Sequence, residues 1–219
     1  MDIQLIIAAI LPPIFVIYYI YKQDLHEKEP HKLLLFTFLL GVFSCAPILF
    51  VELIFDENFF KNQFLYYLIG IGFVEEGVKY LILIIYNYPK EDFNEQYDGI
   101  LYTVVMCMGF ALVENIGYVL GDSGIDGMSV AILRMFTAIP LHATCGIIMG
   151  FYLGKAKMDT NSKLSSLILA LIIPTIIHGL YDYFLSINVF VFSLITLISA
   201  LIYGKNALKI HQSKSPFKS

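Results

Sequence analysis

The sequence predicts an all-α fold, a polytopic transmembrane helix bundle of about seven spans that forms a single domain over residues 1–219. Of the 219 residues, 58% are hydrophobic and only 15% are charged, and the mean hydropathy is +0.74. Apolar runs of about twenty residues, long enough to cross a bilayer as a helix, recur along the chain. Runs such as LLLFTFLLGVF are continuously apolar, whereas the strands of a membrane β-barrel alternate apolar and polar residues.

Short polar connections separate the apolar segments, so each connection ends one predicted helix and begins the next. The first segment, MDIQLIIAAILPPIFVIYYIY, has no basic residue at its start and is longer than the apolar part of a signal peptide. We therefore expect it to be retained as a span. The spans are expected at residues 3–21, 33–55, 64–86, 98–120, 129–154, 164–185 and 187–204.

Lysine residues fall almost entirely on one side of this arrangement. One set of connections and the C-terminal tail hold eleven lysines, and the opposite set holds only Lys61. Positively charged loops stay in the cytoplasm, so seven spans place the N-terminus outside and the C-terminus inside. We expect a multi-pass protein of the cell membrane with the lipid bilayer around it. The eleven lysines are Lys22, Lys28, Lys32, Lys90, Lys155, Lys157, Lys163, Lys205, Lys209, Lys214 and Lys218.

The remaining composition excludes some function classes. A net charge of −4 and a pI near 5.7 argue against a nucleic-acid partner. The three cysteines, Cys45, Cys107 and Cys145, lie inside apolar runs at unrelated spacings. They indicate small core residues and neither disulfides nor a cysteine-based zinc site.

The third predicted span contains three charged residues in the stretch GFVEEGVKYLIL. Each charge at the centre of a membrane helix costs about 2.5–3.5 kcal/mol on insertion scales. Glu75 and Glu76 precede Lys79 by four and three residues, so either carboxylate can pair with the ammonium on one helix face. Two adjacent carboxylates in a low dielectric repel each other, which suits one of them to general acid–base catalysis. A buried ion pair that holds helices together is the alternative.

Further ionisable residues lie in three other spans. The stretch HGLYD places His178 and Asp182 one turn apart, so the aspartate can fix the imidazole tautomer and present the other nitrogen to a ligand. Glu114 lies in FALVEN and His142 in LHATCG, and each is a weak signal alone. Glu52, near the outer end of the second span, is expected to lie at the membrane interface.

The depths of these residues overlap. At a rise of 1.5 Å per residue, Glu75 and His142 lie about 18–20 Å from the outer ends of their spans, and Glu114 and His178 about 9–12 Å. Carboxylates and imidazoles at this depth suit general-base hydrolysis of a peptide bond, metal-assisted hydrolysis, or transport of protons or ions. The chemistry alone favours hydrolase and transporter equally.

Four motifs in order along the chain, EEGVK, FALVEN, LHATCG and HGLYD, resemble those of the PrsW family of intramembrane proteases. That family is distantly related to the type II CAAX prenyl proteases. The resemblance covers nearly the whole chain, with further agreement at KQDLHEKEP and YDGILY. It implies a peptidase that makes the first, extracytoplasmic cut in a single-pass anti-sigma factor. A second intramembrane protease then completes the release of an extracytoplasmic-function sigma factor.

The resemblance also implies roles for individual residues. Glu75 and Glu76 match the essential glutamate pair, and His178 matches the histidine of an HxxxD motif. We expect Glu75 to act as the general base on water, while Glu76 and Lys79 adjust its protonation. Oriented by Asp182, His178 is expected to polarise the carbonyl or to protonate the leaving amine.

His142 is expected to share that task, and Glu114 and Asn115 to hold the water or the substrate backbone. The CAAX enzymes carry histidine where this chain has Glu114, so the resemblance leaves a divalent metal such as zinc and a metal-free mechanism both open. The candidate metal ligands are Glu75, Glu114, His142 and His178.

Three other readings compete with an anti-sigma protease. A non-catalytic scaffold or chaperone would clasp single-pass proteins without cutting them. A CAAX-type prenyl protease would act on prenylated tails, but it would carry histidine in place of Glu114. A transporter would show pseudo-repeated broken helices, a pattern that the sequence lacks.

Overall fold

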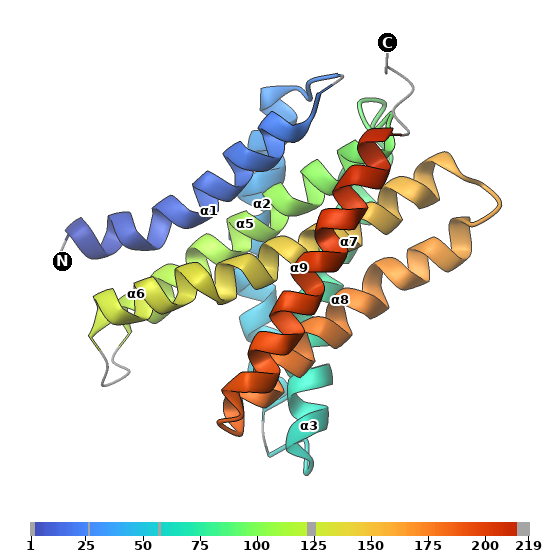
Figure 1. Cartoon of the computed structure of the whole chain (residues 1–219). Coiled ribbons are helices and arrows are strands. Elements are labelled where there is room, and N and C mark those ends of the chain that lie inside the picture. Colours follow the sequence, from blue (N-terminus) through green and yellow to red (C-terminus); the bar gives the residue numbers. More distant parts are fainter. Residues whose placement is uncertain (1–2, 26, 57, 122–125, 214–219) are drawn as a thin grey trace.

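The computed structural model describes residues 3–25, 27–56, 58–121 and 126–213, which are helical apart from short connections and contain no strand. Figure 1 shows the helices crossing one another in a single bundle, with α5 in its middle. The elements are α1 (Ile3–Gln23), α2 (His31–Ile54), α3 (Gln63–Leu65), the π-helix η1 (Tyr66–Phe73), α4 (Val74–Tyr86), α5 (Gln96–Leu120), α6 (Gly127–Phe136), α7 (Ala138–Met158), α8 (Lys163–Ser186) and α9 (Phe190–Ser213).

The predicted all-α, membrane-spanning fold class is confirmed. Within the described ranges, six helical stretches are long and apolar enough to cross a bilayer. The third predicted span corresponds to α3, η1 and α4, which follow one another without a gap but are each shorter than a span. Both the count of seven and the orientation stay predictions. Part of the connection between α5 and α6, together with Lys214 and Lys218, lies outside the described residues.

The predicted span 129–154 is not one straight helix. It consists of α6 and α7, separated at Thr137, whose φ of −124° and ψ of −75° are not helical. Pro140 has no backbone N–H to donate to the carbonyl of Phe136, four residues earlier, so a helix is interrupted there at little cost. Pro140 then occupies the first turn of α7, where a proline is tolerated.

Helices α5 and α7 form the centre of the bundle. Most of α5 is buried, and it packs against α7, α2 and α1. Gly99 and Gly150 let the two central backbones touch, because a Cβ on either glycine would overlap the other helix's backbone. Small residues allow membrane helices to approach closely. The tight contact fixes the relative position of Glu114 on α5 and His142 on α7.

The outer helices expose their apolar side chains. Leu53 on α2 and Leu164 on α8 are 80% and 73% exposed, which would be costly in water over so large an area. In the hydrocarbon core of a membrane such side chains contact lipid tails that are equally apolar, and a helix forms all of its backbone hydrogen bonds internally. The exposed faces therefore fit a protein surrounded by lipid.

Two further glycines bring η1 and α8 together. A Cβ on Gly72 would lie 2.9 Å from the backbone nitrogen of Gly179, and a Cβ on Gly179 would lie 2.7 Å from the Cα of Leu68. Both distances are too short for real side chains, so only glycine permits this approach. It places His178, next to Gly179, against the first turn of α4, which continues from η1.

A polar cluster lies where the connection between α1 and α2 meets the start of α5. The Tyr102 hydroxyl donates a hydrogen bond to Glu29, and Asp98 accepts backbone N–H groups of Asn94 and Glu95 at 2.9 and 2.7 Å. Burial raises the pKa of Glu29 to about 10, and the negative charge of Asp98 adds to the effect. Glu29 therefore keeps its proton at neutral pH.

Candidate active site

The centre of the site is the first turn and a half of α4. Lys79 is fully buried and donates to Glu76 Oε1 at 2.7 Å and to Glu75 Oε2 at 3.2 Å. The spacings of three and four residues put all three side chains on one face of the helix, as predicted. The ammonium partly offsets the two carboxylates, so the group can be buried without a net charge of −2.

His178 reaches this turn from α8. Its Nδ1 lies 2.9 Å from Glu76 Oε1, and its Nε2 lies 3.3 Å from Asp182 Oδ2 and 3.8 Å from Glu75 Oε2. The predicted pairing of His178 with Asp182 is present. Each ring nitrogen thus faces a carboxylate oxygen, so a proton on either nitrogen has an acceptor nearby.

Glu114 and His142 come from the central helices. His142 Nε2 lies 2.8 Å from Glu114 Oε2, and the same oxygen accepts from Arg134 at 2.8 Å. Asn115 is directed away from the site, because its amide donates to Ala9 on α1 and accepts from Arg134, both at 2.8 Å. These contacts fix α1 and α6 against α5, and the expected role of Asn115 in holding the water or the substrate backbone stays a prediction.

Aromatic contacts join the two halves of the site. The rings of His142 and His178 meet edge to face with centroids 5.1 Å apart. The Phe110 ring lies 5.5 Å from that of His142, and Lys79 Nζ lies 4.3 Å from its centroid. Such a cation–π contact stabilises a buried ammonium. Phe110 thus separates Lys79 from the adjoining cavity and holds His142 in place.

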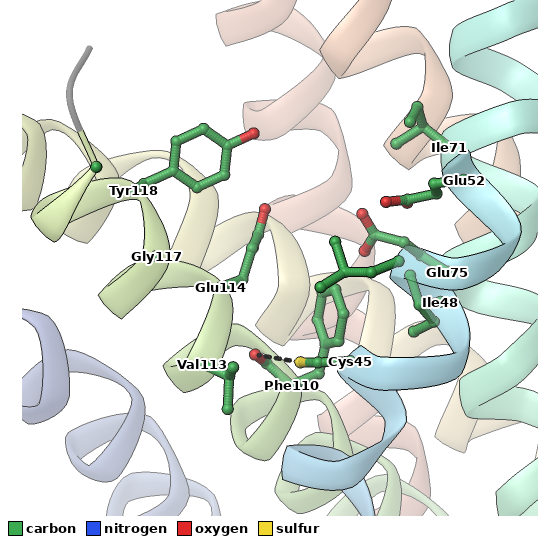
Figure 2. Close-up of a pocket in the computed structure, with 12 residues that line it drawn as sticks. Cys45, Ile48, Glu52, Ile71, Glu75, Phe110, Val113, Glu114, Gly117 and Tyr118 are labelled. Carbon is green, nitrogen blue, oxygen red and sulfur yellow. Dashed lines mark hydrogen bonds between the residues drawn. The ribbon is translucent and has the colours of Figure 1, made fainter. Parts of the chain in front are cut away.

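A cavity of about 510 Å³ opens beside these residues. Figure 2 shows Glu75 and Glu114 directed into it from opposite sides, with the Tyr118 hydroxyl facing the same space. It reaches the last turns of α2 and α5, the ends that the lysine distribution predicts to be extracytoplasmic. The described lining residues are Cys45, Ile48, Leu49, Glu52, Ile71, Glu75, Phe110, Val113, Glu114, Gly117, Tyr118 and Gly121.

Glu52 is a site residue that the sequence reasoning left out. It was expected at the membrane interface, but its carboxylate points towards Glu75 within the cavity (Figure 2). Cys45, Ile48, Leu49 and Glu52 are spaced by three, four and seven residues from the first, the period of one helix face. That spacing could have indicated that Glu52 shares a face with core residues.

The structure brings all seven predicted catalytic residues into one region. Their roles stay proposals, whereas their proximity is a property of the fold. The seven are Glu75, Glu76, Lys79, Glu114, His142, His178 and Asp182.

A possible metal set differs from the expected one by one residue. Among the described residues, ligand atoms of Glu75, Glu76, His142 and His178 lie within 4.8 Å of one another. Glu76 takes the place expected for Glu114. The Oε2 atom of Glu114 instead contacts Arg134 and His142. Two carboxylates and two imidazoles are donors that zinc accepts.

Buried atoms of this set are free to bind. Glu76 Oε2 and His142 Nδ1 have no hydrogen-bond partner in the described part of the chain, and such atoms usually find one. These residues therefore fit a divalent ion, although Lys79 already supplies one positive charge to the same carboxylates.

Membrane helices around a buried cluster of glutamates, histidines and a lysine fit the class of multi-pass intramembrane hydrolases, and the comparison with known families decides between that class and a transporter. Residues 29–204 match the family described as PrsW family intramembrane metalloprotease. The chain belongs to this family, and it is a multi-pass membrane peptidase.

Individual relatives agree with this assignment. The chain is 38% identical to Protease PrsW of Bacillus subtilis (strain 168) over 184 residues, or 83% of each chain. It is 36% identical to Protease PrsW of Oceanobacillus iheyensis over 184 residues, covering 84% of this chain and 83% of the relative. Protease PrsW of Clostridioides difficile (strain 630) is 34% identical over 194 residues, covering 86% and 82%. No solved structure gives a significant match.

Proposed function

We propose that this chain makes the first, extracytoplasmic cut in a single-pass anti-sigma factor and thereby leads to activation of an extracytoplasmic-function sigma factor. One observation carries the proposal. Glu75 belongs to the buried ionic cluster and also lines a cavity that reaches the ends of α2 and α5. A peptide strand in that cavity would meet the carboxylate directly.

Glu75 is the general base in this proposal. Lys79 and His178 lie near its Oε2, which leaves Oε1 for a water molecule in the cavity. The water oxygen attacks the carbonyl carbon of the scissile bond while its proton passes to Glu75. When the C–N bond breaks, the departing nitrogen needs a proton, which Glu75 or the His178 imidazolium supplies.

The remaining residues position these groups. Glu76 holds both Lys79 and His178 at hydrogen-bond distance, so it fixes the two cations on either side of the base. His142 Nδ1 has no hydrogen-bond partner among the described residues, and in this proposal it donates, once protonated, to the carbonyl oxygen on which negative charge develops. Glu114 orients His142 through its Nε2.

A divalent ion would be held by Glu75, Glu76, His142 and His178. When bound, it would polarise the carbonyl and acidify the attacking water. A chelator separates the two mechanisms. Loss of cutting after dialysis against a strong zinc chelator, restored by added zinc, supports the metal-dependent one, and undiminished cutting refutes it.

Co-expression with a tagged single-pass anti-sigma factor tests the function. The wild type, Glu75→Gln and His178→Ala are compared at matched abundance, with Glu91→Gln as the control because Glu91 is exposed and lies in a connection. We expect a shortened fragment with the wild type and the control only. The same fragment with all four proteins would show that another protease cuts. If none gives a fragment but all bind the tagged protein, the scaffold reading replaces this one.

A further inference from the structure

The cavity beside Glu75 carries an unbalanced negative charge. Glu52, Glu75 and Glu114 line it, and the described lining residues include no lysine, arginine or histidine. Lys79 lies 3.2 Å from Glu75, and Arg134 lies 2.8 Å from Glu114. Neither cation is among the residues that line the cavity. The surface that a ligand would meet is therefore acidic, with apolar walls around it.

Glu52 differs from the other two carboxylates. It makes no hydrogen bond and no ion pair to any described residue, whereas Glu75 and Glu114 each contact a cation. Figure 2 shows its carboxylate in the cavity, facing that of Glu75. A carboxylate that is half-buried among apolar residues is costly without a partner, and the described part of the chain supplies none.

The position of Glu52 in its helix has no stabilising effect of its own. Glu52 lies in the last turn of α2, and this turn, which ends at Ile54, contains no basic residue. The unpaired carbonyls at a helix C-terminus carry partial negative charge, which favours cations and disfavours carboxylates. A cation bound at Glu52 would interact favourably with both the side chain and the helix end.

The shape of the site favours a cation carried on a peptide over a free metal ion. The group of described residues with metal-ligand spacing is Glu75, Glu76, His142 and His178, and it does not include Glu52. A cavity of about 510 Å³ falls in the range that holds ligands of several side chains. A lysine or arginine could extend its apolar stem along Ile48 and Leu49 and place its charge at Glu52.

We propose that Glu52 is a specificity-determining residue that binds a lysine or arginine side chain of the substrate next to the scissile bond. This inference rests on the proposed proteolytic function, because it places the substrate backbone beside Glu75. A charge-assisted hydrogen bond in a partly desolvated site is expected to favour the basic side chain over glutamine by about tenfold or more.

Binding can be measured without cutting. The full chain with Glu75→Gln is placed in lipid nanodiscs, and labelled single-span peptides are titrated against it. The peptides are identical except at positions scanned near the extracytoplasmic end, where each carries lysine, glutamine or glutamate. We expect one position at which lysine lowers the Kd about tenfold relative to glutamine.

Three further variants, each made in the Glu75→Gln background, test whether Glu52 causes the preference for lysine. Glu52→Gln should abolish it, and Glu52→Lys should reverse it in favour of the glutamate peptide. Leu53→Gln is the matched control, because Leu53 is the next residue on α2, is highly exposed and is not among the lining residues. It should keep the preference for lysine. Equal Kd values at every position, or a preference that survives Glu52→Gln, would overturn the inference.

Cutting of the same peptides by the otherwise wild-type chain separates the two proposals. If the chain cuts without regard to the scanned residue, the proteolytic function stands and the Glu52 subsite is refuted. If it cuts none of them but binds with a preference that depends on Glu52, binding of a basic side chain at Glu52 stands, whereas the proteolytic function and the place of this site beside a scissile bond are refuted.

Discussion

The contact of η1 with α8 makes a quantitative prediction for Gly179→Ala. The added Cβ would lie 2.7 Å from the Cα of Leu68, about 0.7 Å short of ordinary contact at 3.4 Å. Because the opposing atom is backbone, the helices must move apart. His178, adjacent to Gly179, would then move from 2.9 Å to about 3.6 Å from Glu76 Oε1, beyond hydrogen-bond distance.

The expected losses follow from that displacement. Overpacking of a tight contact costs about 1–3 kcal/mol of stability, and a misplacement of this size in a catalytic constellation can reduce the rate by about 100-fold. The assays are the cut fraction of the co-expressed substrate, kcat/KM of the purified chain, and Tm in detergent. Cutting should fall much further than the loss of folded protein explains.

Gly77→Ala is the matched control. Gly77 lies between Glu76 and Lys79 on α4, yet a Cβ there would meet nothing within 4 Å. Replacing glycine inside a helix is expected to stabilise the chain by about 0.5–1 kcal/mol, and cutting should persist. If Gly179→Ala cuts at the wild-type rate with an unchanged Tm, the close approach of α8 to η1 at Gly179 does not set the position of His178.

Three further predictions concern charge. Lys79→Met should destabilise the chain by about 3–5 kcal/mol, because it leaves buried carboxylates without their cation; the Tm in detergent measures this. Arg134→Gln should lower kcat/KM with little change in KM, since Arg134 fixes Glu114 and does not line the cavity. The pKa of Glu29, raised to about 10 by burial and Asp98, gives stability that is fully present below about pH 4.5 and is lost as the pH rises towards 10. The Tm of Glu29→Gln minus that of the wild type should therefore rise between pH 5.5 and pH 9, and a constant difference would contradict the assignment.

Local spacing predicted much of the site. The contacts of Lys79 with Glu75 and Glu76, and of His178 with Asp182, follow from helix periodicity, so sequence was sufficient for them. The apolar runs likewise gave the fold class, because a bilayer imposes the length of its helices.

The contacts between helices could not be read in the same way. Arg134 on α6 pairs with Glu114 on α5, and the periodic pattern of neither helix reports a contact between the two. Glu76 takes the place of Glu114 in the candidate metal set because α8 packs against α4 and brings His178 next to Glu76. The spacing of Glu52 from Cys45 and Ile48 places it on a buried face of α2, but nothing in α2 alone indicates the cavity between α2 and α5.

The ion pairs of α4 also bear on how the chain enters the membrane. Lys79 finds both of its carboxylate partners within its own helix, three and four residues away. Insertion of three separate charges would be costly, but pairs within one turn can form as soon as that turn is helical, before α8 or α5 has arrived. The segment can therefore leave the translocation machinery with Lys79 already paired, so that one net negative charge enters the bilayer in place of three separate charges. Assembly of the active site then needs only lateral docking of helices that are already in the bilayer.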